Sequence, residues 1–382
     1  MAVGLAFSAI AALVAAVLYG MSGTTRYVPD ACSNVGTFLS SHVVGQDLAI
    51  NQLVDAICEH LLDPLSAKES GAPVLPKKPL IISVHGPPGV GKTYTHTLLA
   101  RALYNKDAST AVDCPGSSCQ GSKVLYGMSY VESERASQLD AVRNAVMDHL
   151  RSTPNPLLVV EEYDKLDCDS RALLRQLVRH PELANATMNK AIVLLESNLG
   201  FLELEAMLTA AGGDKGLITA EAAESRLREV VMAAWRRNPC ESLEDTLAFS
   251  STIDFFLPFF PLTRPEITVL MAAELRSHYA PRLGALGAAL SPEPEAVEWL
   301  VDRVDFAGGS YPIEGAKQVS TVCVKHVSRL VRRLQEELRA GHGTGEKHGH
   351  GHGGVTEYLL GVAPGGRELQ LRKADAVPLG HA

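Results

Sequence analysis

Three short apolar runs recur through the middle of the chain, and each ends in small or polar residues. They span Leu80 to Val84, Leu157 to Val160 and Ala191 to Leu195. The runs are rich in aliphatic residues and too short for typical helices, so each predicts a buried strand. Between them, residues 95–103 and 137–150 favour helices. This alternation predicts an α/β fold in which helices flank a parallel sheet.

Apolar residues also recur at helical spacing before the first predicted strand. After a polar approach over residues 24–42, the residues Val43 to Asp47 open an amphipathic helix that continues to about Leu62. We therefore predict that residues 24–79 form an N-terminal approach and helix. A large domain over residues 80–261 would follow, closed by an aromatic cluster between 249 and 262 that we interpret as core.

The pattern beyond this cluster predicts a small helical domain over residues 262–340. Thr263 to Glu266 forms a capping box ahead of a helix to about His278. Ser291 and Pro292 start a second helix, and a third runs from about Ile313 to Leu338 with basic residues along its later turns.

Two further segments end the chain. Residues 341–354 alternate Gly with His, which is typical of a flexible linker; weak metal binding is the less favoured alternative. Residues 355–382 predict a C-terminal hairpin and tail, because two apolar runs are separated by Pro-Gly-Gly.

The first residues differ from the rest of the chain. Met1 to Tyr19 carry no charged side chain and are rich in Ala, Val and Leu. Their length lies between the apolar core of a signal peptide and a full membrane span. We predict that residues 1–23 are an apolar signal peptide or a membrane anchor. A buried core helix is disfavoured, because the stretch has no polar face.

Composition limits the possibilities further. The 382 residues, 46% hydrophobic and 20% charged, suit two or three folded units. With 35 basic and 43 acidic residues, the net charge is -8 and nothing indicates a nucleic-acid partner. The seven cysteines show no zinc-ligand spacing and do not fix the compartment. Cys114 and Cys119 are compatible with a loop disulfide or with two free thiols.

A phosphate-binding loop follows the first predicted strand. Its spacing is Gly-x-x-x-x-Gly-Lys-Thr, and a chance glycine-rich turn is disfavoured because a predicted helix follows directly. Glycines let backbone N–H groups surround an anion, and the helix N-terminus adds positive potential. Lys92 would bring charge to the terminal phosphates, and Thr93 would offer a hydroxyl ligand to Mg²⁺. The nucleotide-binding residues would be Gly86, Pro87, Pro88, Gly89, Val90, Gly91, Lys92 and Thr93.

Acidic and amide side chains follow the other two predicted strands. Glu161 and Glu162 end the second, and Asn198 follows the third. Doubly wound folds bind their ligands at this carboxyl edge of the sheet. Glu161 would hold Mg²⁺, usually through a water, Glu162 would polarise the attacking water, and Asn198 would orient it. A solvated helix start or a turn Asn would explain these residues separately, but with the phosphate loop they predict ATP hydrolysis.

The combined motifs resemble an AAA+ ATPase of the Clp/HSP100 branch, and within it a torsin, over about residues 36–340. Shared with Clp proteins are Val44-Gly45-Gln46, the phosphate loop, the acid pair, Asn198, and Gly315-Ala316-Lys317, which is similar to the second sensor motif. The segments that resemble torsins are 78–86, 162–166, 195–200 and 253–262. The resemblance implies nucleotide between a large domain and a small helical lid domain, with Val44 as a binding and Lys317 as a catalytic candidate. It also implies a homo- or hetero-oligomeric ring and residence in the endoplasmic reticulum lumen or nuclear envelope.

One departure from Clp proteins concerns the arginine finger. Clp-type relatives carry Asn-Arg-Ile-Asp at the end of the large domain, where this chain has Ser251-Thr252-Ile253-Asp254. An arginine finger contributes roughly three to five decades in rate. Torsins also lack it and borrow an arginine from a membrane-anchored activator. The resemblance therefore implies an ATPase that remodels proteins or membrane-associated complexes and needs such a partner.

Other features point back to self-sufficient Clp unfoldases. Torsins typically have Asn where Thr93 stands, and residues 125–132 resemble the loop that grips a protein substrate, with Tyr130 as the gripping group. Ala316 stands where torsins carry a redox-active Cys, and Glu161 replaces the usual Asp. A Clp-like unfoldase that threads substrate past Tyr130 is thus the alternative. A nucleotide-gated scaffold is a third possibility, against which Glu162 argues, because binding alone does not need it.

Overall fold

The computed structural model describes residues 25–61, 78–127, 135–179, 189–237, 242–307, 311–343 and 355–374. The chain divides into two compact units, Met1–Phe260 and Pro261–Ala382. Within the described ranges, no helix has both the length and the apolar character that crossing a bilayer requires. The predicted signal peptide or anchor at 1–23 and the candidate gripping residue Tyr130 lie outside these ranges.

A five-stranded parallel sheet forms the centre of the first unit, with the strand order β2-β3-β4-β1-β5. The three predicted strands are confirmed as β1, β3 and β4 in the middle of the sheet, where their side chains are almost all buried. The strands are β1 (Leu80–His85), β2 (Ser122–Tyr126), β3 (Leu157–Glu161), β4 (Ile192–Ser197) and β5 (Phe255–Pro258).

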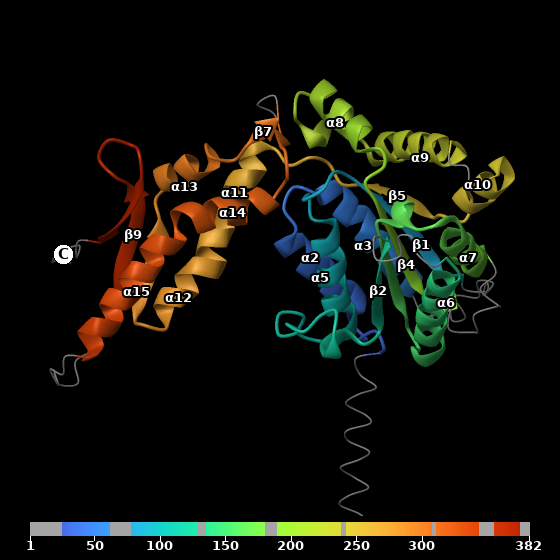
Figure 1. Ribbon diagram of the computed structural model, residues 1–382, viewed down its shortest axis with the longest axis horizontal. Coiled ribbons are helices and arrows are strands. Elements are labelled where there is room, and N and C mark those ends of the chain that lie inside the picture. Colours follow the sequence, from blue (N-terminus) through green and yellow to red (C-terminus); the bar gives the residue numbers. More distant parts are fainter. Residues whose placement is uncertain are drawn as a thin grey trace, which may run out of the picture. The chain divides into compact units, whose positions relative to one another are not determined.

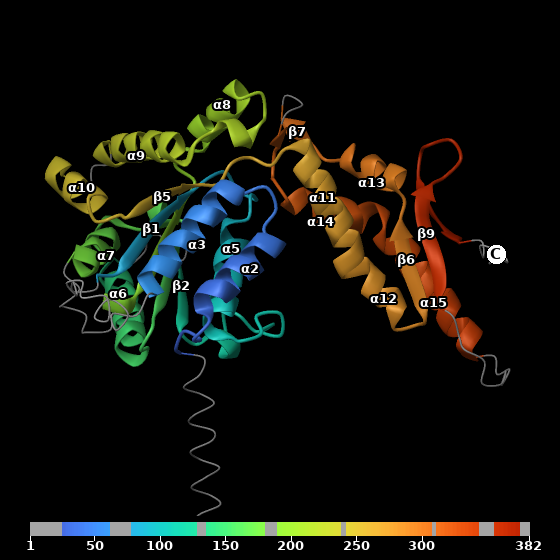
Figure 2. The same cartoon turned by 180° about the vertical axis from the view of Figure 1, so that it is seen from behind.

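Helices cover both faces of this sheet. In Figures 1 and 2, α2, α3 and α5 lie on one side, and α6 and α7 lie on the other. This layered arrangement confirms the predicted α/β fold. The helices are α2 (Ala31–His42), α3 (Asp47–Leu61), α5 (Lys92–Tyr104), α6 (Arg135–Ser152), α7 (Cys168–Arg179), α8 (Phe201–Ala210), α9 (Ala220–Arg236) and α10 (Leu243–Ser250), with 3-10 turns at Ser117–Cys119, Tyr163–Lys165 and Lys215–Leu217.

One local prediction for the first unit was wrong, and two edge strands were not predicted. Residues 31–42 are helix α2 rather than a polar approach, and α2 buries Val35 and Leu39 against the rest of the unit. Strand β2 lies at one edge of the sheet, and β5 lies at the other edge within the aromatic cluster, whose interpretation as core is confirmed by its buried phenylalanines. Edge strands this short carry too little periodicity to be recognised from sequence.

Disulfides join parts of the first unit. Cys32 and Cys58 connect α2 to α3, Cys114 is bonded to Cys119, and Cys168 is also disulfide-bonded. Of the two states that the sequence left open for Cys114 and Cys119, the structure has the disulfide.

The second unit contains helices and two small sheets. The capping box of Thr263 and Glu266 is present at the start of α11. Strand β9 pairs in parallel with β6 and antiparallel with β10, so the predicted hairpin extends a three-stranded sheet. The elements are α11 (Arg264–Glu274), a π-helical turn (Leu275–Tyr279), α12 (Ala280–Gly284), β6 (Ala288–Pro292), α13 (Pro294–Val301), β7 (Phe306–Ala307), β8 (Tyr311–Pro312), α14 (Lys317–His326), α15 (Ser328–Gly343), β9 (Thr356–Val362) and β10 (Leu369–Lys373).

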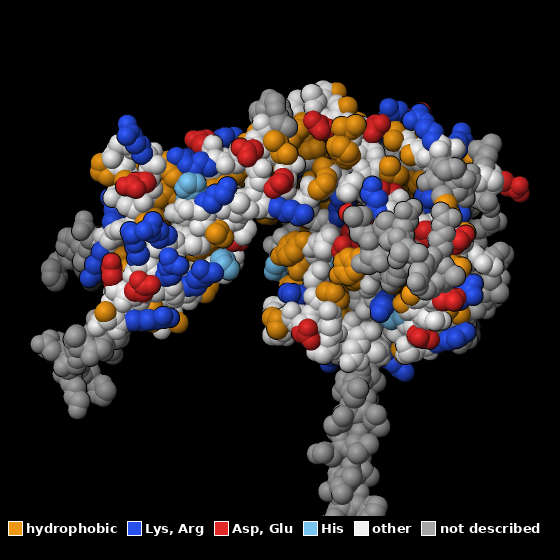
Figure 3. All heavy atoms as spheres, viewed as in Figure 1, with side chains coloured by type: hydrophobic (Ala, Val, Ile, Leu, Met, Phe, Trp, Pro, Cys, Tyr) orange, Lys and Arg blue, Asp and Glu red, His pale blue; other side chains and the backbone are white. Residues whose placement is uncertain are grey.

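Two predictions for this unit were also wrong. Ser291 and Pro292 end strand β6, and the second helix begins two residues later as α13. The expected third helix is two helices, α14 and α15, separated at Val327. Its Lys and Arg residues are exposed, and Figure 3 shows Lys and Arg side chains gathered over α14 and α15.

Candidate active site

The phosphate-binding loop joins β1 to α5 and requires glycine at two positions for different reasons. A Cβ atom on Gly86 would lie 2.2 Å from the carbonyl oxygen of Phe259, which follows β5. Gly91 has a φ of 104° at the start of α5, a left-handed conformation that side chains disfavour. The predicted glycines thus let β5 approach closely and let the chain turn into the helix.

Lys92 and Asn198 meet at this loop. The Nζ atom of Lys92 donates hydrogen bonds to Gly86 O at 2.7 Å, Pro87 O at 2.9 Å and Asn198 Oδ1 at 2.9 Å. Burial lowers the pKa of Lys92 to about 8, although the carboxylates around it act in the opposite direction. The two residues predicted from separate strands therefore lie in one site at the carboxyl edge of the sheet.

Glu161 ends β3 near Thr93 of the phosphate loop. Its Oε1 atom is buried and has no hydrogen-bond partner. Burial raises the pKa of Glu161, and the charge of Glu196 raises it further. Leaving a buried carboxylate oxygen unpaired is costly, and oxygen ligands suit Mg²⁺. The residues present thus fit a Mg²⁺ ion held by Thr93 and Glu161.

Glu162 is the one residue other than glycine with positive φ in the described part of the chain. Its φ and ψ are 51° and 46°, in the left-handed helical region. The neighbouring chain is close, because a Cβ atom on Gly127 would lie 2.2 Å from the carbonyl oxygen of Glu162. Strained backbone of this kind gathers at functional sites. The left-handed backbone thus lies directly after Glu161, where β3 ends.

Sequence analysis missed the buried neighbours of these residues. His96 on α5 and Glu196 on β4 are joined by a hydrogen bond of 2.7 Å, and both are almost fully buried. Burial lowers the pKa of His96, but the hydrogen bond and charge of Glu196 outweigh it and raise the pKa above its ordinary value. The available signal was a carboxylate inside an otherwise apolar strand, since an acidic residue is rarely buried without a partner.

His85 was also missed, and it connects β1 to the segment that carries Asn198. Its Nδ1 atom donates to Leu199 O at 3.1 Å, and its Nε2 atom accepts from Ser83 Oγ at 2.7 Å. Burial lowers the pKa of His85 to about 4, so the ring is neutral at physiological pH. This neutral ring fixes the end of β4 next to the phosphate loop.

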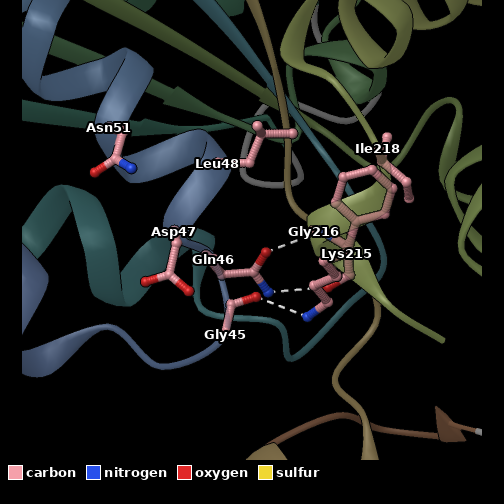
Figure 4. A pocket seen from close by; sticks show the side chains of 9 residues that line it. Gly45, Gln46, Asp47, Leu48, Asn51, Lys215, Gly216 and Ile218 are labelled. Atoms are coloured by element: carbon pink, nitrogen blue, oxygen red, sulfur yellow. Dashed lines mark hydrogen bonds between the residues drawn. The ribbon is translucent and has the colours of Figure 1, made fainter.

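A pocket of about 280 Å³ lies beside the phosphate loop in the same unit. Gln46 supports it by donating to Val90 O at 3.3 Å and Phe260 O at 2.9 Å, and it accepts from Phe260 N. In Figure 4, Lys215 extends toward Gly45, whose carbonyl oxygen accepts its hydrogen bond at 2.7 Å. The lining is Gly45, Gln46, Asp47, Leu48, Asn51, Lys215, Gly216, Ile218 and Phe260.

Three further residues singled out from the sequence are located as follows. Val44 does not line the pocket, although its neighbours Gly45 and Gln46 do. Lys317 begins α14 in the second unit and is exposed. Thr252 bonds locally, because its Oγ1 donates to Phe249 O at 2.7 Å.

Two family models match the chain. The AAA domain model matches residues 77–199 and the Torsin model matches residues 19–114. Torsin-like proteins from Drosophila melanogaster and Caenorhabditis elegans are similar, at 27% identity over 258 residues and 22% over 283 residues. These alignments cover 65% and 69% of this chain and 69% and 72% of the two relatives.

Similarity also extends to the ClpB chaperones. The chain is 27% identical over 301 residues to Chaperone protein ClpB of Chlamydia pneumoniae, an alignment that covers 74% of the chain but 31% of ClpB. The AAA domain match includes the phosphate loop, the acid pair and Asn198. Together with the parallel sheet and the convergence of these residues, the matches show that the chain is similar to torsin-like AAA+ ATPases and to the Clp/HSP100 branch.

Proposed function

We propose that this ATPase is activated by a partner and remodels proteins or membrane-associated complexes in the endoplasmic reticulum lumen or nuclear envelope. The observation that carries the proposal is Thr252, which stands where Clp-type relatives place an arginine. Its hydroxyl bonds to the backbone of its own turn and carries no charge. Without a positive group at the terminal phosphate, hydrolysis would be slow until an activator donates an arginine.

The site residues have separate roles in this proposal. The loop backbone and Lys92 would bind the β- and γ-phosphates, while Thr93 and Glu161 would hold Mg²⁺. Bound Mg²⁺ supplies neutralisation of phosphate charge. Glu162 would accept the proton of the attacking water, and Asn198 would orient that water. Lys317 would contribute charge from the small domain.

The pocket beside the loop suits the nucleotide base. Apolar side chains and backbone groups line most of it, as in many sites for planar ligands. ATP and Mg²⁺ are thus the proposed ligands. Ring neighbours, a protein substrate and a membrane-anchored activator are the proposed partners.

The proposed compartment is supported by the disulfides. Such bonds persist in oxidising compartments and are rare in the cytosol. The Cys32–Cys58 bond joins helices through residues 26 positions apart. The apolar residues 1–23 and the likeness to torsin-like proteins favour entry into the secretory pathway.

Placing an arginine at position 252 tests the missing finger. Thr252→Arg should raise partner-free ATP turnover by roughly three decades if the added guanidinium reaches a neighbouring site. Ser251→Arg is the matched control, because it adds the same charge one residue away on an exposed side chain. Equal turnover in wild type and both variants, at a rate already fast without a partner, would contradict the proposal.

A self-sufficient unfoldase is the second candidate, favoured by the long ClpB match and by Thr93, which stands where torsins typically have Asn. It requires Tyr130 to grip substrate. ATP-dependent unfolding of a tagged test protein, without a partner and abolished by Tyr130→Ala but not by Tyr126→Ala, would establish it. No unfolding by wild type would leave the partner-activated function.

A further inference from the structure

The ring of His96 lies between two carboxylates beneath the phosphate loop. Its Nδ1 atom is 2.7 Å from Oε1 of Glu196, and its Nε2 atom is 3.6 Å from Oε1 of Glu161. The His96 and Glu196 side chains are only 3% and 4% exposed. His96 stands four residues after Lys92 in α5, so the helix that carries the phosphate-binding lysine also carries this bridge.

The arrangement favours a hydrogen-bonded bridge over a second metal site. Ligand atoms of His96, Glu161 and Glu196 lie within 4.8 Å of one another, as a metal site would require. The two nitrogens of an imidazole point away from each other, however, and here each faces a different carboxylate. Glu196 therefore holds the ring through Nδ1, and this orientation presents Nε2 to Glu161.

Glu161 has a particular need for such a bridge. It is one methylene longer than aspartate and therefore loses more rotamer freedom when its carboxylate is fixed. Thr93 lies near this carboxylate, and the buried Oε1 atom has no hydrogen-bond partner. His96 Nε2 is the ion-pair donor that faces Oε1, and Glu196 holds the ring in that orientation. Outer partners of this kind orient metal ligands.

We propose that His96, held by Glu196, is a positioning residue that keeps the Glu161 carboxylate turned toward the Mg²⁺ side of the phosphate loop. The proposal rests on the proposed role of Glu161 in holding Mg²⁺. It predicts an effect on Mg²⁺ binding that is separable from nucleotide binding itself, because the side chain of His96 faces Glu161 and Glu196.

The test titrates Mg²⁺ against the binding of fluorescent ATP by the full chain, in the Glu162→Gln background to prevent turnover. His96→Gln should raise the half-saturating Mg²⁺ concentration about 10-fold, the lower end of the usual effect of removing an outer partner. Its affinity for nucleotide in EDTA should stay within about 2-fold of the parent. His149→Gln is the control, since it removes a buried histidine from the opposite end of the sheet.

The direction of the shift separates positioning from simple charge. If His96 acted only as a positive charge near the metal, its removal would lower the Mg²⁺ requirement, because cations repel. A lower requirement in His96→Gln therefore overturns the proposal. The proposal is also overturned if His96→Gln lowers the affinity for nucleotide in EDTA as much as it lowers the affinity in Mg²⁺. The role of His96 would then be purely structural.

A double-mutant cycle covers the case in which His96→Gln does not fold. Glu196→Gln changes one atom of the buried pair, and it should raise the Mg²⁺ requirement about 3-fold by releasing the ring. In a Glu161→Asp background the shorter carboxylate withdraws from His96, so Glu196→Gln should then have almost no effect. If Glu196→Gln raised the Mg²⁺ requirement equally with Glu161 and with Glu161→Asp, the proposal would be overturned.

Two outcomes distinguish the remaining alternatives. One equivalent of Zn²⁺ bound by the nucleotide-free parent and lost in His96→Gln would mean that the cluster is a cation site, which overturns the bridge. Nucleotide binding by the parent without any dependence on Mg²⁺ would overturn the proposed role of Glu161 and the bridge together. A normal parent titration with no shift in His96→Gln would overturn the bridge alone.

Discussion

At the carboxyl ends of β1, β3 and β4 several ionisable side chains lie together, whereas at the amino end of the sheet a neutral hydroxyl bonds to backbone carbonyl oxygens. The carboxyl ends bring together Lys92, Glu161 and His96. At the amino ends, Tyr104 Oη bonds to Gly121 O and Asn155 O, each at 2.7 Å.

Two buried histidines show the same difference. Glu196 and Glu161 raise the pKa of His96 against the effect of burial, whereas burial lowers the pKa of His149 to about 4. One histidine is surrounded by carboxylates and the other mainly by backbone. We infer that the amino end stabilises the sheet and that the carboxyl end accepts unfavourable charge for function. The predictions below test this division.

The largest effect is expected from Glu162→Gln. An amide cannot accept the proton of the attacking water, so ATP turnover should fall by about two to four decades. ATP affinity should be retained, because the change is isosteric. Single-turnover kinetics with radiolabelled ATP measure both quantities. Unchanged turnover would remove Glu162 from the catalytic role and would favour the scaffold alternative.

Lys92→Ala should weaken ATP binding with little effect on fold. Removing a buried, hydrogen-bonded charge partner costs about 2–5 kcal/mol, which corresponds to at least about 30-fold in affinity. Equilibrium binding of labelled ATP measures this change. Lys215→Ala is the control at the neighbouring pocket, where the lysine bonds to a backbone carbonyl, and it should have a smaller effect. Equal losses of ATP affinity in Lys92→Ala and Lys215→Ala would contradict a special role for the charge of Lys92 at the phosphates.

Tyr104→Phe, at the amino end of the sheet, should have the opposite effect to Lys92→Ala: lower stability with unchanged ATP affinity. The change removes the hydroxyl that serves two buried carbonyl oxygens and should lower the free energy of unfolding by about 1–3 kcal/mol. ATP affinity should remain unchanged. Chemical denaturation and nucleotide binding on the same preparation test both statements. A large loss of ATP affinity in a folded Tyr104→Phe protein would contradict the division between the ends.

The smallest effect concerns pH and His149. Its folded pKa, about 4, lies below the ordinary value of 6.5, so the unfolded chain binds more protons between these values. The free energy of unfolding should therefore rise with pH across this window and fall on acidification. Between pH 7 and pH 5.5, wild type should lose about 1 kcal/mol more than His149→Gln. Parallel denaturation curves at the two pH values measure the difference, and identical losses would contradict it.

Local motifs explain why the carboxyl end could be predicted in large part. The loop from Gly86 to Thr93 and the pair Glu161–Glu162 are each contiguous in sequence, and the adjoining strands are buried apolar runs. Parallel pairing then places their ends together without further information. The fold class followed from the same runs.

Contacts between distant residues explain what was missed. The hydrogen bond of His96 to Glu196 spans 100 residues, and Cys32 and Cys58 are 26 residues apart. No local pattern marks either pair. Strand β6 was read as a helix start because its partner β9 lies more than 60 residues later. Strand pairing of this kind depends on tertiary contacts rather than on periodicity.

The most direct measurement of the central claim is ATP turnover by the purified full chain without any partner. Nucleotide binding is measured independently, and Glu162→Gln supplies the background rate. Tight ATP binding with turnover close to that background is the expected result, because Thr252 provides no arginine finger. Brisk partner-free turnover, well above Glu162→Gln, would contradict the account. It would mean that another arginine, such as Arg236 or Arg237, completes the site.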